Sequence, residues 1–421
     1  MKKAPKSLRL HIAIFGRTNV GKSSFLNLAT GQDVAITSPV PGTTTDVVEK
    51  AMELLPLGPV LFLDTAGLDD TSELSKKRLE KSRRIFDRSD IILLVVEPEI
   101  WTDYETNVVR EAETRDIPLI VIINKTDLTT PGGPYLSRLR RLTERIVLCS
   151  SLNTADRDVT LSTLKKHLIE VCPADFLQPP PLIGDLVPAS GLAVLIVPID
   201  LQAPKGRLIL PQVQTIRDTL DNDAASLIVK EREYAAMLDS LKTKPDIVVC
   251  DSQVVLKMTA DTPADVKCTT FSTLFSRYKG DLIESVKGAT TIDKLKDRDK
   301  VLIAEACTHH PLEDDIGRVK IPRWLKQYTG ADLDIDMCAG KDYPDNLKSY
   351  KLIIHCGGCT LNRRHMLARI QYAKEQGVPI TNYGVSISFL QGVLKRILSP
   401  FPAALDALQR HSTSASAKHA R

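Results

Sequence analysis

The sequence predicts an α/β protein built of three consecutive domains, the first of which has a mostly parallel sheet. Short apolar runs alternate with helix-like segments along the chain, which is the pattern of parallel sheets covered by helices. A chain of 421 residues is long enough for two or three domains of ordinary size. The alternation is interrupted twice, at a run of three prolines and at a short segment around Pro263, and these interruptions mark the expected domain boundaries.

The first domain is expected over residues 1–175. Buried strands are predicted where apolar residues follow one another without a polar break, at 11–15, 60–63, 91–96, 119–123 and 146–149. The prolines at 179–181 are incompatible with a helix or a central strand, so residues 176–188 are predicted to form a linker.

Two further domains are expected beyond this linker. The second, over 189–262, has predicted strands at 193–198, 226–229 and 246–250 and helices at 211–220 and 234–241. Because a domain this small buries little of its surface, pairing with a second copy is favoured, and we expect a dimerisation domain. The third, over 263–408, has strands at 300–304 and 351–355 and a helix at 361–376. Residues 409–421, rich in Ser, Ala and basic side chains, are predicted to be disordered.

Composition limits the partners and the compartment. The 56 basic and 52 acidic residues leave a net charge of only +4, which gives no argument for nucleic acid as the main partner. The longest purely apolar run, residues 91–96, is far too short to span a membrane, and no apolar signal segment follows the basic N-terminus. We therefore expect a cytoplasmic protein, whose eight cysteines are thiols or metal ligands rather than disulfides.

Residues 16–23 read Gly-Arg-Thr-Asn-Val-Gly-Lys-Ser and fit the pattern of a phosphate-binding loop between a strand and a helix. Backbone N–H groups of such a loop, here including those of Val20 and Gly21, surround the phosphates at a helix N-terminus. Lys22 is expected to reach the β and γ oxygens, and the hydroxyl of Ser23 to bind Mg²⁺, with Ser24 beside it.

Two later motifs complete a nucleotide site. Asp64-Thr65-Ala66-Gly67 ends a predicted strand, so Asp64 can hold Mg²⁺ through water while the N–H of Gly67 contacts the γ-phosphate. Asn124-Lys125-Thr126-Asp127 has the form N-K-x-D, in which the carboxylate of Asp127 accepts paired hydrogen bonds from guanine N1 and N2. Since adenine lacks this donor pair, the expected nucleotide is GTP.

Together with Gly42-Thr43-Thr44-Thr45-Asp46, these motifs resemble the complete set of a small-GTPase domain across residues 8–172. The resemblance implies a P-loop GTPase fold that binds GTP or GDP with Mg²⁺. It further implies that Thr44 is the switch threonine on Mg²⁺ and that Ser150 and Ser151 contact the guanine. The GTP-binding residues it implies are Asn19, Val20, Gly21, Lys22, Ser23, Ser24, Asp64, Gly67, Asn124, Lys125, Asp127, Ser150 and Ser151.

The domain departs from Ras-type enzymes at the residue that orients water. Leu68 follows Gly67 where those enzymes have glutamine, so the intrinsic rate of hydrolysis is expected to be low. Asn19 resembles the asparagine of tRNA-modification and ribosome-assembly GTPases that helps to bind K⁺, and the alternative is that it only shapes the loop. Lys22, Asn19, Thr44 and Gly67 are the expected catalytic residues.

A second group of candidate ligands follows two strands of the third domain. Cys307-Thr308-His309 comes after the strand at 300–304, and His355-Cys356-Gly357-Gly358-Cys359 ends the next. Because carboxyl ends of parallel strands share one crevice, these side chains can converge. Spacing alone leaves structural zinc, a thiol redox pair and an iron–sulfur cluster open. The remaining cysteines lack such spacing and are expected to be small buried residues: Cys149, Cys172, Cys250, Cys268 and Cys338.

With this C-x-H…H-C-x-x-C pattern behind a GTPase domain, nearly the whole chain resembles the FeFe-hydrogenase maturation GTPases, the HydF family. The resemblance implies a homodimer whose last domain binds a 4Fe-4S cluster through Cys307, Cys356 and Cys359. His309 or His355 is then the labile fourth ligand, or a residue that contacts a ligand without binding iron itself. The implied role is a scaffold that receives a di-iron precursor from radical-SAM maturases and delivers it to apo FeFe-hydrogenase.

Two other functions compete with this interpretation. One is an RNA-modification or ribosome-assembly GTPase in which the C-terminal cysteines and a histidine hold structural zinc. The other is a GTP-dependent interaction switch without metal. Metal analysis separates the three.

Overall fold

A computed structural model describes residues 4–30, 48–65, 75–152, 156–198, 208–306, 315–340, 343–344 and 346–416. Among the residues singled out above, Thr44, Gly67, Leu68, Cys307 and His309 lie outside these ranges, as do their neighbours at 42, 43, 45, 46, 66 and 308. The chain divides into two compact units, Met1–Pro179 and Pro180–Arg421. None of the helices in the described ranges is both long enough and apolar enough to cross a membrane.

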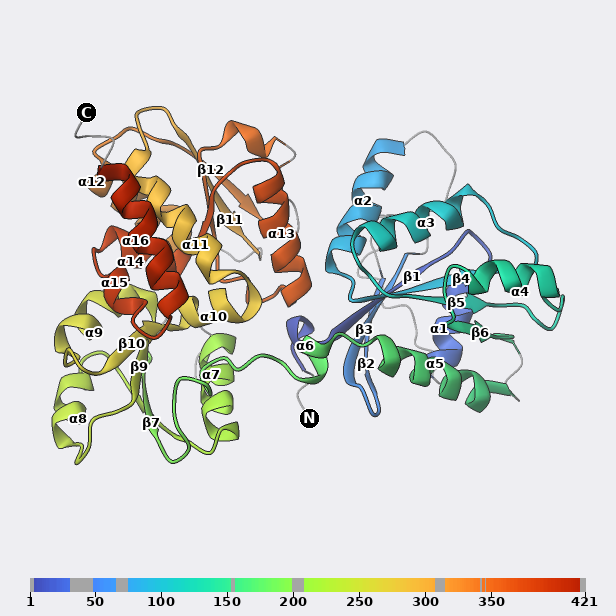
Figure 1. The fold of residues 1–421 in the computed structure, drawn as a ribbon, viewed down its shortest axis with the longest axis horizontal. Coiled ribbons are helices and arrows are strands. Elements are labelled where there is room, and N and C mark those ends of the chain that lie inside the picture. Colours follow the sequence, from blue (N-terminus) through green and yellow to red (C-terminus); the bar gives the residue numbers. More distant parts are fainter. Residues whose placement is uncertain are drawn as a thin grey trace. The chain divides into compact units, whose positions relative to one another are not determined.

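The first unit contains a six-stranded sheet in the order β2-β3-β1-β4-β5-β6 (Figure 1). Every neighbouring pair is parallel except β2 and β3, which form an antiparallel hairpin. The strands are β1 (Leu10–Phe15), β2 (Val48–Leu54), β3 (Gly58–Asp64), β4 (Ile91–Val96), β5 (Leu119–Ile123) and β6 (Ile146–Leu148). The helices are α1 (Lys22–Thr30), α2 (Ser75–Arg88), α3 (Asp103–Thr114), α4 (Gly133–Arg140), α5 (Arg157–Val171) and α6 (Ala174–Leu177).

Alternate residues of β1 explain why helices cover both faces of this sheet. Ile12 and Ile14 pack in a core with residues of α1 and α5, whereas Ala13 and Phe15 pack in a second core with residues of α2, α3 and α4. A strand that is buried on both faces reads as an unbroken apolar run, which is the pattern that predicts it. The predicted mostly parallel α/β fold is confirmed.

The second unit contains two parallel four-stranded sheets, in the orders β10-β9-β7-β8 and β12-β11-β13-β14. The strands of the first are β7 (Leu192–Ile196), β8 (Ala225–Val229), β9 (Ile247–Cys250) and β10 (Lys267–Thr270). Those of the second are β11 (Lys300–Glu305), β12 (Asp334–Ala339), β13 (Leu352–His355) and β14 (Ile380–Asn382).

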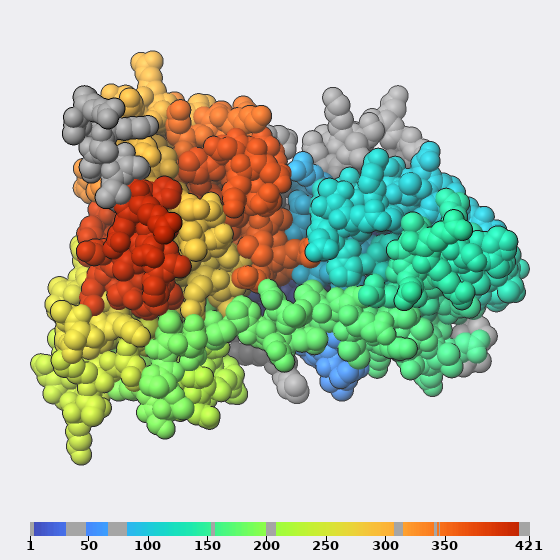
Figure 2. Space-filling model, in the orientation of Figure 1, coloured from blue at the N-terminus to red at the C-terminus, as the bar shows by residue number. Residues whose placement is uncertain are grey.

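Helices cover these two sheets and fill the space between them. They are α7 (Leu210–Asp221), α8 (Tyr234–Ser240), α9 (Val255–Asp261), α10 (Phe271–Lys279), α11 (Leu282–Ala289), α12 (Ile321–Thr329), α13 (Arg363–Glu375), α14 (Tyr383–Leu390), α15 (Leu394–Ile397) and α16 (Pro402–Ser416). Helix α13 lies on one face of the second sheet, and α11, α14 and α16 lie on the other (Figure 1). In this unit, α11, α13 and α16 contribute much of the surface in view in Figure 2.

The two sheets of the second unit share their interior. One core contains Val194 and Val248 of the first sheet together with Ile303 and Ile354 of the second. This common core accounts for the two sheets belonging to one compact unit.

Three boundaries differ from those expected from sequence. Strand β10 completes the first sheet of this unit, so that sheet extends beyond residue 262. Leu182 and Ile183, which were expected in a linker, are 2% and 0% exposed and pack in a core with residues of this same sheet. Helix α16 continues to Ser416, beyond the expected end at 408.

Candidate functional sites

The loop between β1 and α1 approaches its neighbours too closely for side chains at two of its glycines. A Cβ atom on Gly16 would lie 2.4 Å from the carbonyl oxygen of Val95, and one on Gly21 would lie 2.2 Å from Nδ2 of Asn124. Gly21 also has a φ of +94°, which L-residues rarely adopt. The glycines of the motif are therefore required by the shape of the loop itself.

Lys22 lies across the loop and holds its backbone. Its Nζ donates hydrogen bonds to the carbonyl oxygens of Gly16 at 2.5 Å and Arg17 at 2.9 Å. The hydroxyl of Ser23 donates to Oδ2 of Asp64 at 3.2 Å, so the fold brings together two of the residues expected at Mg²⁺. Asn19 has a φ of +65° and an exposed side chain at the same loop.

Asn124 joins the phosphate loop to the predicted guanine motifs. Its Nδ2 donates to the carbonyl oxygen of Val20 at 2.9 Å, and its Oδ1 accepts from the N–H and the hydroxyl of Ser151 at 3.0 and 2.8 Å. The carboxylate of Asp127 is on an exposed residue, and Ser150 is buried. Three motifs far apart in the sequence thus meet at the carboxyl ends of β1, β5 and β6.

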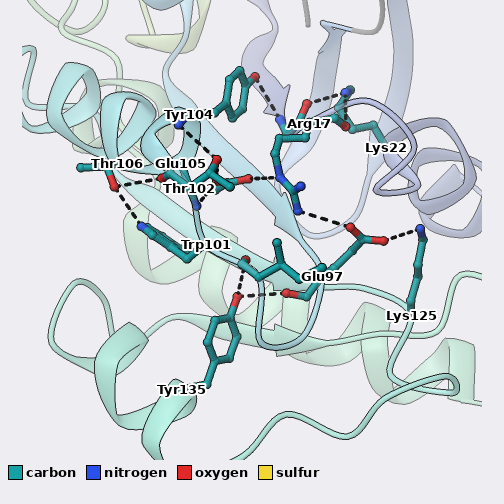
Figure 3. Close-up of polar contacts among 12 residues, drawn as sticks. Arg17, Lys22, Glu97, Trp101, Thr102, Tyr104, Glu105, Thr106, Lys125 and Tyr135 are labelled. Atoms are coloured by element: carbon teal, nitrogen blue, oxygen red, sulfur yellow. Dashed lines mark hydrogen bonds and ion pairs between the residues drawn. The ribbon is translucent and has the colours of Figure 1, made fainter.

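A network of charged residues surrounds the loop and was not predicted from the sequence (Figure 3). Arg17 donates to Oε1 of Glu105 at 2.7 Å and to Oε2 of Glu97 at 3.3 Å. Lys125 of the N-K-x-D motif contacts Oε1 of the same Glu97 at 2.5 Å. Glu97 therefore links the phosphate loop to the guanine motif, and the guanidinium of Arg17 is held by carboxylates.

Glu105 anchors this network in the interior. Its Oε2 accepts from the N–H and the hydroxyl of Thr102, which begins α3 as a capping box. Burial alone would raise the pKa of Glu105, but these bonds and the one from Arg17 outweigh it and lower the pKa. The T-x-x-E spacing of Thr102 and Glu105 could have predicted the capping box from the sequence. It could not have predicted the contact of Glu105 with Arg17.

The two-cysteine turn, residues 356–359, follows β13 in the second unit. The N–H of Cys356 donates to the carbonyl of Ala304 at 2.8 Å, and its sulfur accepts from the N–H of Ala306 at 3.1 Å. Cys356 and Cys359 are both half-buried, and a Cβ on Gly357 would meet no atom within 4 Å. Two half-buried cysteines close together in sequence, with an N–H donor to one sulfur, fit the thiolate ligands of an iron–sulfur cluster. Within the described ranges, no three His, Cys, Asp or Glu residues are grouped as a metal site.

His355 is held from both sides of its ring. Nδ1 lies 2.7 Å from the carbonyl oxygen of Cys356, and Nε2 lies 2.8 Å from Nη1 of Arg369. Because a carbonyl only accepts and a guanidinium only donates, the ring carries its proton on Nδ1 and accepts at Nε2. Burial, with the charge of Arg369, lowers the pKa of His355 to about 3. In this arrangement the ring is neutral and both nitrogens are engaged.

Lys279 of α10 contacts the same turn and was also not predicted. It is buried, and its Nζ donates to the carbonyl oxygens of Cys359 at 3.2 Å and Leu361 at 3.0 Å. Burial lowers the pKa of Lys279 to about 8, whereas the charge of Cys359 acts to raise it.

The five cysteines not expected to bind metal differ in burial. Cys149, Cys250 and Cys268 are buried, as expected, while Cys172 and Cys338 are half-buried.

Family models match three consecutive segments of the chain. Residues 11–125 match the 50S ribosome-binding GTPase model, residues 182–280 the hydrogen maturase F dimerization domain, and residues 283–400 the hydrogen maturase F tetramerization domain.

Curated relatives match the GTPase segment. The tRNA modification GTPase MnmE of Synechococcus sp. (strain JA-2-3B'a(2-13)) is 43% identical over 124 residues, covering 29% of this chain and 26% of that protein. MnmE of Nitrosospira multiformis is 39% identical over 118 residues, covering 28% and 26%. The aligned part of the chain thus spans about a quarter of the length of these relatives.

Solved structures are similar over the same segment. A variant of Era from Aquifex aeolicus with GDP and aluminium fluoride is 29% identical, with a TM-score of 0.33, covering 39% of this chain and 56% of that one. The G domain of FeoB from T. maritima is 21% identical, with a TM-score of 0.30, covering 39% and 98%.

The phosphate loop, the N-K-x-D motif and the sheet that joins them define the first unit as a P-loop GTPase domain. The two segments behind it carry the domains of a single family. The chain belongs to the hydrogen maturase F family.

Proposed function

We propose that this protein is a GTP-hydrolysing scaffold that binds a 4Fe-4S cluster and assembles the precursor of the di-iron subcluster or delivers it to apo FeFe-hydrogenase. The observation that carries the proposal is the match of residues 182–280 and 283–400 to the hydrogen maturase F domains, behind a GTPase domain. Its partners are the radical-SAM maturases and the apo-hydrogenase, all in the cytoplasm. The test is activation of apo-hydrogenase by protein purified after co-expression with the maturases, compared with protein expressed alone.

In the nucleotide site, Lys22 binds the β and γ phosphate oxygens, Ser23 and Asp64 hold Mg²⁺, and Asp127 selects guanine. Their contacts with the loop, with each other and with Asn124 support this assignment. Thr44 and Gly67 complete the set as proposed switch residues. The nucleotide then controls partner contacts through ordered loops.

Hydrolysis is proposed to be slow and stimulated by K⁺ at Asn19. The left-handed backbone of Asn19 keeps an exposed amide at the phosphate loop, and Leu68 replaces the glutamine of Ras-type enzymes. The test is the turnover of GTP in KCl and in NaCl at equal ionic strength. Stimulation by K⁺ that disappears in Asn19→Ala supports the proposal, whereas equal rates in both salts contradict it.

In the cluster site, Cys307, Cys356 and Cys359 supply the thiolates. A cluster held by three thiolates leaves one iron with a replaceable ligand, to which a second metal fragment can attach. Of the two roles open to His355, support of a ligand is favoured, because both ring nitrogens are engaged and Nδ1 bonds to the backbone of Cys356. His309 remains the proposed exchangeable group. Iron, sulfide and zinc analysis of anaerobically purified protein tests the site.

Self-association is supported by the two matched domains, and we place the homodimer surface on α7 and β8. Helix α7 buries polar Gln212, Thr215 and Thr219, whereas Val213 and Leu220 are about half exposed. Ile228 on the edge strand β8 is exposed as well. Leu220→Glu should yield a smaller species in light scattering after size exclusion, and an unchanged mass would contradict this placement.

An RNA-modification GTPase with structural zinc is the second candidate, because the GTPase segment is 43% identical to an MnmE. That similarity covers 29% of the chain, whereas both later segments match hydrogen maturase F domains. Stoichiometric zinc without iron, together with salt-dependent RNA binding, would favour this candidate. Absence of any bound metal would favour a GTP-dependent switch.

A further inference from the structure

The last turn of α10 is in direct contact with the two-cysteine turn. Lys279 is the last residue of this helix, and its Nζ donates to the carbonyl oxygens of Cys359 and Leu361 at 3.2 and 3.0 Å. In the opposite direction, Arg363, the first residue of α13, donates to the carbonyl oxygen of Tyr278. The segment from Cys359 to Arg363 is therefore attached to α10 by charged donors from both sides.

The usual role of a lysine at the end of a helix, bonding to the last carbonyls of that helix, does not account for the contacts of Lys279. Lysine in the last turn of a helix commonly bonds to the free carbonyls of its own helix. Both hydrogen bonds of Lys279 instead cross to residues 80 and 82 positions later in the chain. The residue is only 2% exposed, although lysine is almost never fully buried unless it is paired.

The surroundings of the ammonium group favour a fixed position. Two carbonyl oxygens accept from it, and its Nζ lies 5.6 Å from the centre of the Phe275 ring, within the range of a cation–π interaction. The aliphatic stem is enclosed with the rest of the side chain. A rigid buried cation thus lies against the backbone of Cys359.

We propose that Lys279 is a positioning residue of the cluster site, which fixes the turn carrying Cys359 and places a buried positive charge beside the cluster. The inference rests on the proposed cluster binding at Cys356 and Cys359. A nearby cation stabilises the form of the cluster with one more electron, so Lys279 raises the reduction potential.

The charge is tested in the reconstituted full-length protein by potentiometric titration with dithionite, followed by electron paramagnetic resonance. Lys279→Met keeps the length of the side chain and removes the charge, and we expect a lower midpoint potential. At a fixed potential, the ratio of reduced to oxidised cluster should fall about tenfold, which is about 59 mV for a one-electron couple. Lys279→Arg should restore most of this difference. Lys374→Met, at a half-exposed lysine of α13, is the matched control and should match wild type.

Equal potentials in wild type and Lys279→Met, with equal cluster content, would overturn the role of the charge. The position of the turn is tested separately in the apo-protein by alkylation of Cys356 and Cys359 with iodoacetamide, quantified by mass spectrometry. In Lys279→Met, we expect the two cysteines to be alkylated about tenfold faster than in wild type. The carbonyl oxygens of Cys359 and Leu361 lose their buried donor, so the turn is held less firmly and its thiols are exposed more often. Equal alkylation rates would overturn the positioning role.

These two measurements also separate this inference from the proposed function. Wild-type protein that binds no iron or sulfide would overturn the cluster proposal and the charge role together, while the alkylation rates still decide whether Lys279 holds the turn. An unchanged circular dichroism spectrum shows that each variant is folded, and GTP turnover at the wild-type rate shows that the GTPase unit is intact.

Discussion

The nucleotide site and the two-cysteine turn are built in different ways from the same kind of structure. Both lie at carboxyl ends of parallel strands and before a helix. In the nucleotide site, residues of recognised motifs contact one another, as Lys22 does with Gly16 and Asn124 with Val20. At the cysteine turn, several contacts come from residues outside any motif: Lys279 donates to the carbonyl oxygen of Cys359, and Arg369 donates to His355 just before the turn. A local motif therefore describes the first site well and the second only in part.

Loss of Lys22 should give the largest effect and separate the two sites most sharply. Lys22→Ala removes the cation expected at the β and γ phosphates, so GTP turnover should fall by about 10²- to 10³-fold. Phosphate release measures it. Iron content should be unchanged, since the proposed cluster ligands lie in the other unit. Lys166→Ala, at a lysine whose side chain is 73% exposed, is the control. Loss of iron in Lys22→Ala would show that the two sites are not independent.

The reverse experiment is Cys356→Ser. A hydroxyl is a poor ligand for a cluster, so most of the iron and the paramagnetic signal should be lost while GTP turnover stays at the wild-type rate. Cys338→Ser, another half-buried cysteine of this unit, should keep the cluster. Full iron content in Cys356→Ser would contradict the proposed ligand set.

Sequence predicted the buried strands better than the edge strands. The apolar run at Ile91–Val96 has 0% exposure throughout and is β4, as expected. The missed strands β2, β10, β12 and β14 are all at sheet edges. Strand β2 contains Glu49, Lys50 and Glu53, and an edge strand can keep such side chains because one side of it has no neighbour. A search for apolar runs does not detect this pattern.

The same limit applies to the sites. The Lys22 and Asn124 contacts follow from motifs with fixed spacing, but Lys279 reaches its partners across 80 residues of sequence. Nothing in the pattern around Lys279 distinguishes it from a surface lysine of an amphipathic helix. Lys279 reaches the carbonyl oxygens of Cys359 and Leu361 only because α10 packs against the cysteine turn.

A smaller change tests whether the first site depends on its backbone as much as on its charges. In Gly21→Ala, the new Cβ would lie 2.2 Å from Nδ2 of Asn124 at a φ of +94°. The bond from Asn124 to Val20 should be lost, and GTP affinity should fall about tenfold or more. Gly133→Ala is the matched control, since a Cβ there meets no atom within 4 Å. Isothermal titration calorimetry with a non-hydrolysable analogue gives both affinities. Equal affinities of the two variants for the analogue would show that the loop can rearrange to accommodate the new Cβ atom.

The smallest expected effect concerns the stability of the GTPase unit. Because folding lowers the pKa of Glu105, its contribution is fully present above the ordinary value of 4.5 and is lost as the pH falls through the folded value. Glu105→Gln cannot titrate and weakens the bond from Arg17, so the free energy of unfolding should fall by about 1–3 kcal/mol at pH 7. The difference from wild type should narrow below pH 4.5.

Urea unfolding followed by the fluorescence of Trp101 measures this difference, in a Trp324→Phe background that removes the other tryptophan. The indole of Trp101 bonds to Thr106 beside Glu105, so its signal reports on this region. A difference that stays constant from pH 7 to pH 3.5 would show that Glu105 contributes by packing alone. A narrowing difference would show that the network around the phosphate loop depends on ionised Glu105, in contrast to the cysteine turn, where the fixed charges are cations.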